Sequence, residues 1–137
     1  MKVVPDTNVW IGWLKSGEVS GTRAETGRPL VLVSSIVLQE LWAGVRHDAE
    51  ARDLDRLYRL ALRHGTLLTP PAAAWILAGQ VLARLRSRRS VATARLRSLR
   101  NDVLLAASAF LAGAAVMTRD RSDFELIREE LGVVSVE

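Results

Sequence analysis

Short apolar runs alternate with amphipathic segments along the chain. The apolar runs, each too short for a helix, span residues 2–5, 30–33, 66–69, 114–117 and 133–136. Apolar residues at helical spacing predict helices near residues 9–14, 36–46, 48–63, 71–86, 101–113 and 124–131. Strands that alternate with helices predict an α/β fold, here a three-layer α/β/α sandwich around a mainly parallel sheet of about five strands. We expect a single domain over residues 1–137.

The pattern also gives specific local expectations. Thr7 or Asn8 is expected to cap the first helix, because both residue types accept hydrogen bonds from helix N-termini. The continuous apolar run Leu30–Val33 predicts one strand that is buried on both faces. Trp75 is expected on the buried face of its helix, and residues 16–29 are expected to form a loop with some helix.

Five acidic residues stand where an apolar segment ends or a helix begins: Asp6, Glu40, Asp102, Asp120 and Asp123. The carboxyl ends of parallel strands meet at one edge of a sheet, so three of the five are expected at the same edge, with the other two pointing towards it. Buried carboxylates are costly unless a positive charge neutralises them. Several carboxylates around Mg²⁺ or Mn²⁺ suggest phosphodiester chemistry.

The helix that begins near Asp102 carries small residues on the same face. Ala106, Ala109 and Gly113 share that face at helical spacing. Small residues allow a helix to approach its neighbour closely, which would bring Asp102 near Asp6, although ordinary tight helix–sheet packing explains the same pattern.

Positive charge is concentrated in the middle of the chain. The formal net charge is +4, and ten arginines but no acids lie between Asp55 and Asp102. The planar fork of arginine suits phosphate, although a solvated helical face would give the same composition. The candidates for RNA contact are Arg84, Arg86, Arg88, Arg89, Arg95, Arg97, Arg100, Arg119 and Arg121.

Composition excludes several other classes of site. The chain has no cysteine, which removes disulfides, thiolate zinc sites and a cysteine nucleophile, and this fits the cytosol. His47 and His64 are expected at the surface rather than as ligands or bases. No long apolar segment follows the first residues, and the apolar stretch 103–117 is shorter than a bilayer span. We therefore expect a cytoplasmic protein without a membrane segment.

Four motifs together resemble the signature blocks of PIN-domain ribonucleases, above all the VapC toxins of prokaryotic toxin–antitoxin pairs. The motifs are Asp6-Thr-Asn8, Ile36-Val-Leu-Gln-Glu-Leu41, Asn101-Asp-Val-Leu-Leu-Ala-Ala107 and Thr118-Arg-Asp-Arg-Ser-Asp-Phe124. The family often has Asn where this chain has Asp120, so either Asp120 or Asp123 is the fourth acid. Pro5 and the long basic segment before Asp102 also depart from the family pattern.

The resemblance implies a PIN-like fold and a metal-dependent endoribonuclease. Asp6, Glu40, Asp102 and a late aspartate would hold one or two Mg²⁺ or Mn²⁺ ions, and cleavage would leave 5′-phosphate and 3′-hydroxyl ends. Thr7, Asn8 and Thr118 would either cap backbone groups or orient the acids. The resemblance also implies a cognate antitoxin, whose tail covers the active-site groove and often places an arginine among the acids, and a homodimer.

Two other functions stay open at this point. A phosphatase of the haloacid dehalogenase type would use Asp6 as nucleophile, but it needs a second aspartate two residues later, where Asn8 stands. A binding module without catalysis would use the arginines for RNA and the acids for a metal or a basic partner. Trp10, Trp13 and Trp42 serve either the core or an interface.

Overall fold

Parallel strand pairing organises the structure. The computed structural model describes residues 1–17, 27–133 and 135–136, and in this part of the chain every strand pair is parallel. One sheet has the order β2-β1-β5-β6, and β3 pairs with β4 in a second, smaller sheet. The strands are β1 (Lys2–Pro5), β2 (Leu30–Val31), β3 (Val33–Ser34), β4 (Leu67–Leu68), β5 (Ala114–Met117) and β6 (Ser135–Val136).

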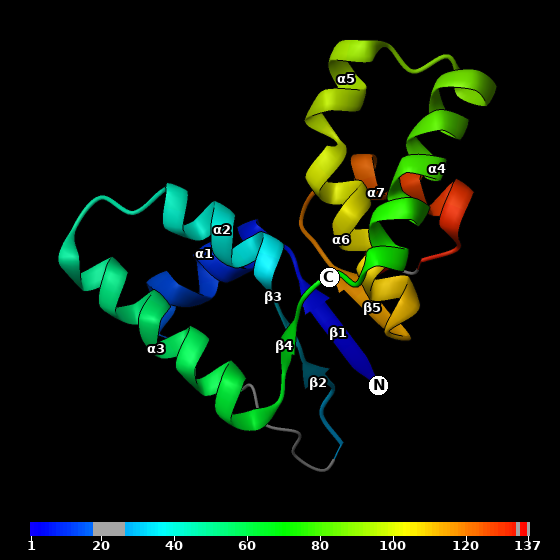
Figure 1. Cartoon of the computed structure of the whole chain (residues 1–137). Coiled ribbons are helices and arrows are strands. Elements are labelled where there is room, and N and C mark those ends of the chain that lie inside the picture. Colours follow the sequence, from blue (N-terminus) through cyan, green and yellow to red (C-terminus); the bar gives the residue numbers. More distant parts are fainter. Residues whose placement is uncertain (18–26, 134, 137) are drawn as a thin grey trace.

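Helices cover the sheets in two groups (Figure 1). The first group is α1 (Thr7–Ser16), α2 (Ser35–Ala43) and α3 (Asp48–His64). The second is α4 (Ala72–Arg89), α5 (Thr93–Ser98), α6 (Arg100–Leu111) and α7 (Arg121–Leu131). This arrangement confirms the predicted three-layer α/β/α fold with a parallel sheet. None of the helices among the described residues has both the length and the hydropathy that a bilayer crossing requires.

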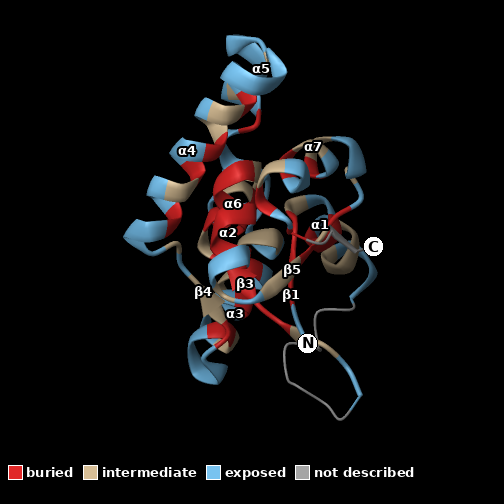
Figure 2. Ribbon diagram, turned by 90° about the vertical axis from the view of Figure 1, so that its right-hand side faces the viewer, coloured by how far each residue is buried: buried red, intermediate tan, exposed pale blue. Residues whose placement is uncertain are grey.

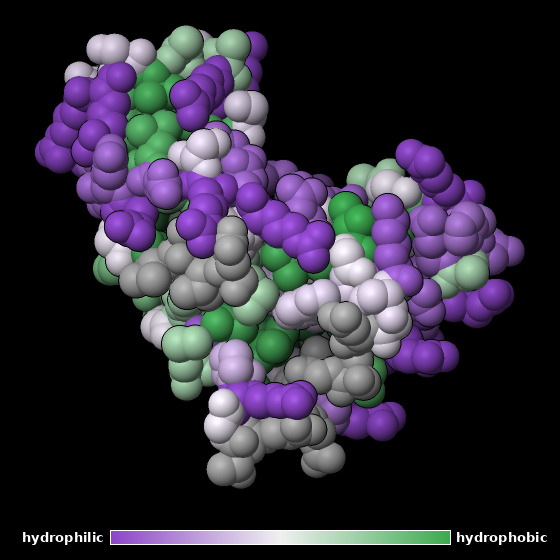
Figure 3. Space-filling view, turned by 180° about the vertical axis from the view of Figure 1, so that it is seen from behind, coloured by the Kyte–Doolittle hydropathy of each residue, from purple (hydrophilic) through white to green (hydrophobic). Residues whose placement is uncertain are grey.

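The two groups of helices form separate lobes of the molecular surface. In Figure 1, β1 points between the group of α1, α2 and α3 and the arm of α4, α5 and α6. Figure 3 shows the opposite side, where hydrophilic side chains gather on both lobes and the outline is indented between them. The carboxyl end of β1 is therefore flanked by two polar lobes.

The single strand predicted over Leu30–Val33 is wrong. The backbone N–H of Leu32 donates to the carbonyl of Val3 in β1, but the N–H of Val33 donates to the carbonyl of Thr66 next to β4. The run therefore changes its hydrogen-bonding partner between two neighbouring residues and becomes β2 and β3. A continuous apolar run records burial on both faces and carries no information on which strand it pairs with.

The expected buried position of Trp75 is also wrong, because α4 packs through a neighbouring face. Its buried residues are Ala74, Ala78, Val81 and Leu85, which follow helical spacing. Trp75 lies one position away from that face and is 60% exposed. The predicted loop over residues 16–29 falls largely on residues 18–26, which lie outside the described residues.

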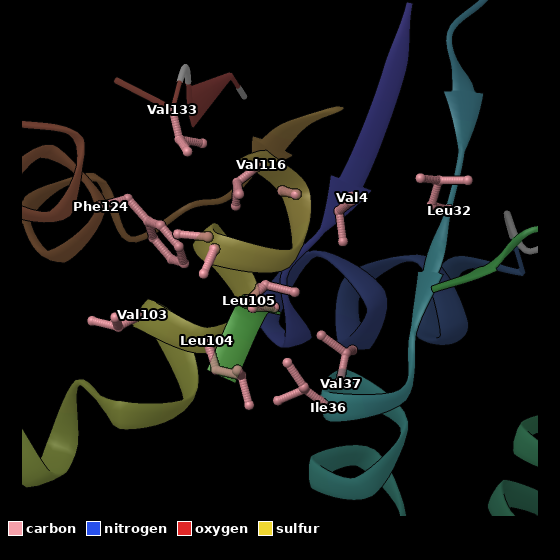
Figure 4. Packing of buried hydrophobic residues seen from close by; sticks show 14 of the residues in the cluster. Val4, Leu32, Ile36, Val37, Val103, Leu104, Leu105, Val116, Phe124 and Val133 are labelled. Carbon is pink, nitrogen blue, oxygen red and sulfur yellow. The ribbon is translucent and has the colours of Figure 1, made fainter. Parts of the chain in front are cut away.

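Helix α6 is the centre of the hydrophobic core (Figure 2). It contacts β5, α4 and α7, and its residues from Val103 to Ala109 are all buried. Figure 4 shows Leu105 of α6 close to Val4 of β1 and Val116 of β5. Ala106 and Ala109 of the expected small-residue face are completely buried, whereas Gly113 is exposed and lies beyond the end of α6. The helix that carries Asp102 is thus fixed against the strands that carry the other acids.

We predict that Leu105→Ala lowers the free energy of unfolding by about 2–5 kcal/mol, because it removes buried methyl groups and leaves a cavity. Leu105 is 2% exposed, whereas Leu111 on the same helix is 46% exposed. Leu111→Ala is therefore a matched control with an expected change of about 0.5 kcal/mol or less. Urea unfolding measures both values, and similar losses in the two variants would contradict the central position of Leu105.

Candidate functional site

Asp6 joins β1, α1 and the end of β5. Its backbone N–H donates to the carbonyl of Met117 at 2.8 Å, directly after the register pair Pro5 and Met117. Its side chain caps α1 by accepting a hydrogen bond from the N–H of Thr7 at 2.7 Å. The prediction that Thr7 or Asn8 caps this helix is therefore wrong. Because β1 ends at Pro5, one residue earlier than that prediction required, the capping position of α1 falls on Asp6 itself.

A short turn after β5 holds the other oxygen of Asp6. The hydroxyl of Thr118 donates to Oδ2 of Asp6 at 3.1 Å and accepts from the backbone N–H of Asp120 at 3.0 Å. Thr118 is 1% exposed, so this linkage is shielded from solvent. The hydroxyl of Ser122 in turn donates to Oδ1 of Asp120 at 3.2 Å. Thr118 therefore orients Asp6, as predicted, and also fixes the turn that carries Asp120.

The five predicted acids lie within electrostatic reach of one another. Burial, followed by the charges of Asp6, Asp123, Glu40 and Asp120, raises the pKa of Asp102 from its ordinary 3.8 to about 7. Burial is also the largest cause of a raised pKa at Asp6, where Thr7 and Thr118 act in the opposite direction and the charge of Asp120 raises it further. Folding thus gathers at one edge of the sheet carboxylates that repel one another.

Glu40 belongs to the same acidic group, although it lies on α2 in the first group of helices. Burial and then the charge of Asp6 raise its pKa, while the nearby hydroxyl of Thr7 lowers it. That hydroxyl is buried and makes no hydrogen bond of normal geometry with the described residues. Asn8, which was predicted to act beside Thr7, is exposed and makes no side-chain hydrogen bond within the same part of the chain. The structure therefore brings Thr7 to the acids but not Asn8.

The chemistry of this site fits a hard divalent cation. Mg²⁺ and Mn²⁺ prefer oxygen ligands such as carboxylates, and the buried hydroxyl of Thr7, close to Glu40, makes no hydrogen bond of normal geometry with the described residues. Across residues 1–17 and 27–133, no three acidic or histidine side chains surround a common point closely enough to hold an ion together. Mg²⁺ does not require such a cage, because it is usually bound through one or two carboxylates and several waters.

A groove of about 520 Å³ opens beside the acids between α1, α2 and α3. Thr7 and Glu40 line the end that belongs to the acidic group. The apolar part of its lining includes Ile11, Leu41 and Leu54. A ligand in this groove would contact apolar side chains and a carboxylate at the same time.

The arginines predicted to contact RNA divide into two sets. The side chain of Glu130 in α7 is only 5% exposed, and it accepts hydrogen bonds from Nε of Arg84 and Nε of Arg89, both at 3.1 Å. Nη1 of Arg88 lies 3.6 Å from the same carboxylate. Desolvation disfavours the charged form of Glu130, but the hydrogen bond and charge of Arg89, with Arg88 and Arg84, outweigh it and lower the pKa. These three arginines therefore join α4 to α7.

The remaining candidates are exposed, and one of them contacts an acid of the site. Arg95 of α5 pairs with Asp123 at 3.3 Å, so it neutralises part of the acidic group. Arg86, Arg97 and Arg100 are exposed and form no ion pair with the described residues. Arg121 begins α7, and Arg119 lies against α1 at Gly12.

Sequence patterns did not indicate two of the residues that shape this region. Glu130 is one of several acids near the C-terminus, and only the contact between α4 and α7 shows that it is buried beneath three arginines. Gly12 is the other, because its contact with Arg119 joins positions far apart in the chain. A glycine inside a predicted helix was the one available signal for it.

Comparisons with known proteins agree with this architecture. A family model described as PIN domain matches residues 3–130. The VapBC complex from Salmonella typhimurium, solved bound to DNA, is 26% identical with a TM-score of 0.70 over 99% of this chain and 97% of that chain. VapBC2 from Rickettsia felis, bound to a fragment of its promoter, is 18% identical with a TM-score of 0.69 over 99% and 98%. A toxin–antitoxin complex from Klebsiella pneumoniae is 20% identical with a TM-score of 0.55 over 90% of each chain. No curated protein matches the sequence.

We predict that Asp102→Asn stabilises the metal-free protein at neutral and higher pH. Folding raises the pKa of Asp102 from 3.8 to about 7, so the stability that comes from holding its proton is fully present below 3.8 and is lost as the pH rises through about 7. Asparagine avoids that loss. Above pH 7 the variant is expected to be more stable than the parent by about 2 kcal/mol, roughly half of what the full pKa difference corresponds to, because water screens part of the side chain.

Urea unfolding in EDTA across this pH range measures the difference between the two proteins. Asp48→Asn is the matched control, because Asp48 is an exposed acid in the first turn of α3. A gap between parent and Asp102→Asn that persists unchanged below pH 3.8 would contradict the assignment.

Proposed function

The chain belongs to the PIN domain family, and we propose that it is a metal-dependent endoribonuclease that acts as the toxin of a type II toxin–antitoxin pair. The observation that carries this proposal is the group of buried and half-buried carboxylates near the carboxyl ends of β1 and β5, which raise one another's pKa values. Such a group is unfavourable by itself and favourable around a cation. The proposed activity resides in one nuclease domain.

Asp6, Glu40 and Asp102 would hold one or two Mg²⁺ or Mn²⁺ ions, together with Asp120 and Asp123. When bound, such an ion neutralises the carboxylates and lowers the pKa of a coordinated water. Asp120 raises the pKa of both Asp6 and Asp102, whereas Asp123 acts on Asp102. We therefore assign Asp120 to the side of Asp6 and Asp123 to the side of Asp102, where Arg95 compensates part of its charge.

The protein's own residues supply orientation and exclusion of water. Thr118 and the N–H of Thr7 each hold one oxygen of Asp6, so the carboxylate cannot rotate freely. The small residues of α6 allow Asp102 to approach Asp6, and both acids are largely withdrawn from solvent. Pre-set geometry of this kind lowers the reorganisation that a phosphodiester substrate would otherwise require.

RNA is the proposed substrate, because exposed arginines flank the acids and arginine suits backbone phosphates. Arg86, Arg97, Arg100 and Arg119 form no ion pair with the residues that the structure describes. We also propose that the protein acts in the cytoplasm. Not all ten arginines between Asp55 and Asp102 are available to RNA, because Arg84, Arg88 and Arg89 already pair with Glu130.

A cognate antitoxin is the proposed protein partner. The similar structures from Salmonella, Rickettsia and Klebsiella are complexes, and the last is described as toxin–antitoxin. The groove between α1, α2 and α3 offers apolar side chains and leads to Glu40. A partner segment with apolar residues and one basic residue would suit that surface. We also propose a homodimer, for which exposed Trp42 and Trp75 are candidate contact residues.

We predict that Asp6→Asn reduces metal-dependent RNA cleavage by at least about 100-fold, because even residues that only orient metal ligands account for up to that factor. Asp48→Asn is the matched control, since it also removes a carboxylate from the start of a helix but lies outside the acidic group. The measurement is cleavage of total RNA with Mg²⁺, Mn²⁺ or EDTA. Full activity of a folded Asp6→Asn protein would contradict the proposed nuclease site, and binding of RNA without any cleavage would favour a binding module.

A further inference from the structure

Gly12 lies inside α1 where no backbone requirement explains a glycine. Its φ angle is not among the positive values found at Gly17, Gly65 and other glycines of the described chain. Glycine inside a helix costs about 0.5–1 kcal/mol relative to alanine. The backbone of α1 therefore does not require a glycine at position 12.

The guanidinium group of Arg119 occupies the space above Gly12. A Cβ atom at position 12 would lie 2.8 Å from Nη2, 3.0 Å from Nη1 and 3.1 Å from Cζ of Arg119. The three atoms nearest to that position therefore all belong to the guanidinium group of Arg119. Gly12 thus provides a seat that any larger residue would fill.

The backbone of Arg119 is fixed from both sides. Thr118 before it is bonded to Asp6, and the N–H of Asp120 after it is bonded to Thr118. The side chain, by contrast, makes no hydrogen bond or ion pair in the part of the chain that the structure describes, and the residue is exposed. Arg119 is also absent from the groups that set the pKa values of Asp6, Glu40 and Asp102. Its charge is therefore held in place and pairs with none of the described residues.

The position along α1 indicates which phosphate this charge would meet. Gly12 is six residues beyond Asp6, which corresponds to about 9 Å along the helix axis. The guanidinium is consequently displaced from the acids. It suits a phosphate that neighbours the cleaved one, and its edge offers parallel N–H donors for two phosphate oxygens.

We propose that Arg119, seated on Gly12, binds a backbone phosphate of the RNA adjacent to the bond that is cleaved. The proposal rests on the nuclease function proposed above and assigns a positioning role to Gly12, which acts through Arg119. Substitution of either residue is expected to remove the contact with the phosphate and to leave the acidic residues unchanged. Gly12→Ala tests the seat directly, because only the flexible end of Arg119 must move and alanine favours the helix.

The first experiment measures binding of a fluorescent single-stranded RNA of mixed sequence in EDTA, over a range of salt concentrations. Arg119→Ala and Gly12→Ala are each expected to weaken binding about tenfold, as a charge-assisted hydrogen bond would. Arg119→Ala should also reduce the salt slope by about 0.7, the value for one phosphate contact on a single strand. Thermal unfolding of Gly12→Ala is expected to stay at the parent midpoint or above it.

Matched controls exist for both substitutions. Gly79 is a helical glycine of α4 with open space around its Cβ position, so Gly79→Ala changes the helix without displacing an arginine. Arg63 is exposed at the end of α3, just before β4, and therefore lies near the opposite edge of the sheet. Arg63→Ala removes one positive charge away from the acids. Both controls are expected to bind RNA within about twofold of the parent.

The outcomes separate this proposal from the proposed nuclease function. Parent-like affinity and salt slope in Arg119→Ala would overturn the phosphate contact, even if cleavage requires metal and Asp6. Parent-like affinity in Gly12→Ala alone would overturn the role of the seat. Weakened RNA binding in both variants of a protein that cleaves no RNA would support the phosphate contact and refute the nuclease. If Arg119→Ala lost binding to a protein partner but kept its affinity for RNA, the proposal would also be overturned, because Arg119 would then contact the partner rather than a phosphate.

Discussion

The parallel pairing of β1 with β5 is the constraint on which the site depends. It aligns Pro5 with Met117, and the hydrogen bond from Asp6 to Met117 continues that register beyond the strands. Residues more than a hundred positions apart are thereby joined, and the hydroxyl of Thr118 can reach Asp6. Pro5 does not interrupt this pairing, because β2 pairs only with Lys2 and Val3 and so ends before Pro5. A shift of one residue would turn Asp6 to the other face of the sheet.

Burial and mutual repulsion of the acidic residues destabilise the folded protein, and other interactions of the fold must offset this. Helix α6 is buried along most of its length, and this packing holds Asp102 where burial and the other acids oppose its ionisation. Part of the compensation is local, since Thr118 and Thr7 donate to Asp6 and Arg95 pairs with Asp123. The remainder is what the proposed cation would neutralise, as expected of a site shaped for function rather than for stability.

The sequence allowed the layers and the acids to be predicted, because both depend on local periodicity and on the rule that parallel strands end at one edge. It did not reveal that Leu30–Val33 changes partner, because strand pairing is a non-local property. Trp75 was misplaced by one helical position, since the apolar residues of α4 fit two neighbouring faces and the choice is made by contact with α6. Thr7 or Asn8 was preferred to Asp6 as the cap of α1, because the choice required the end of β1 to be known within one residue.

The arginines show why charge counts alone are a poor guide to a nucleic-acid surface. Arg84, Arg88 and Arg89 belong to one basic segment, yet their common partner is Glu130 of α7, whose side chain is 5% exposed. Removing one of them would weaken RNA binding only indirectly, through the contact between two helices. Arg119 has the same charge, but a glycine on α1 holds it in place and none of the described residues pairs with it. What distinguishes a residue that recognises phosphate is thus the absence of an internal partner together with a fixed position, and both properties appear only in the folded chain.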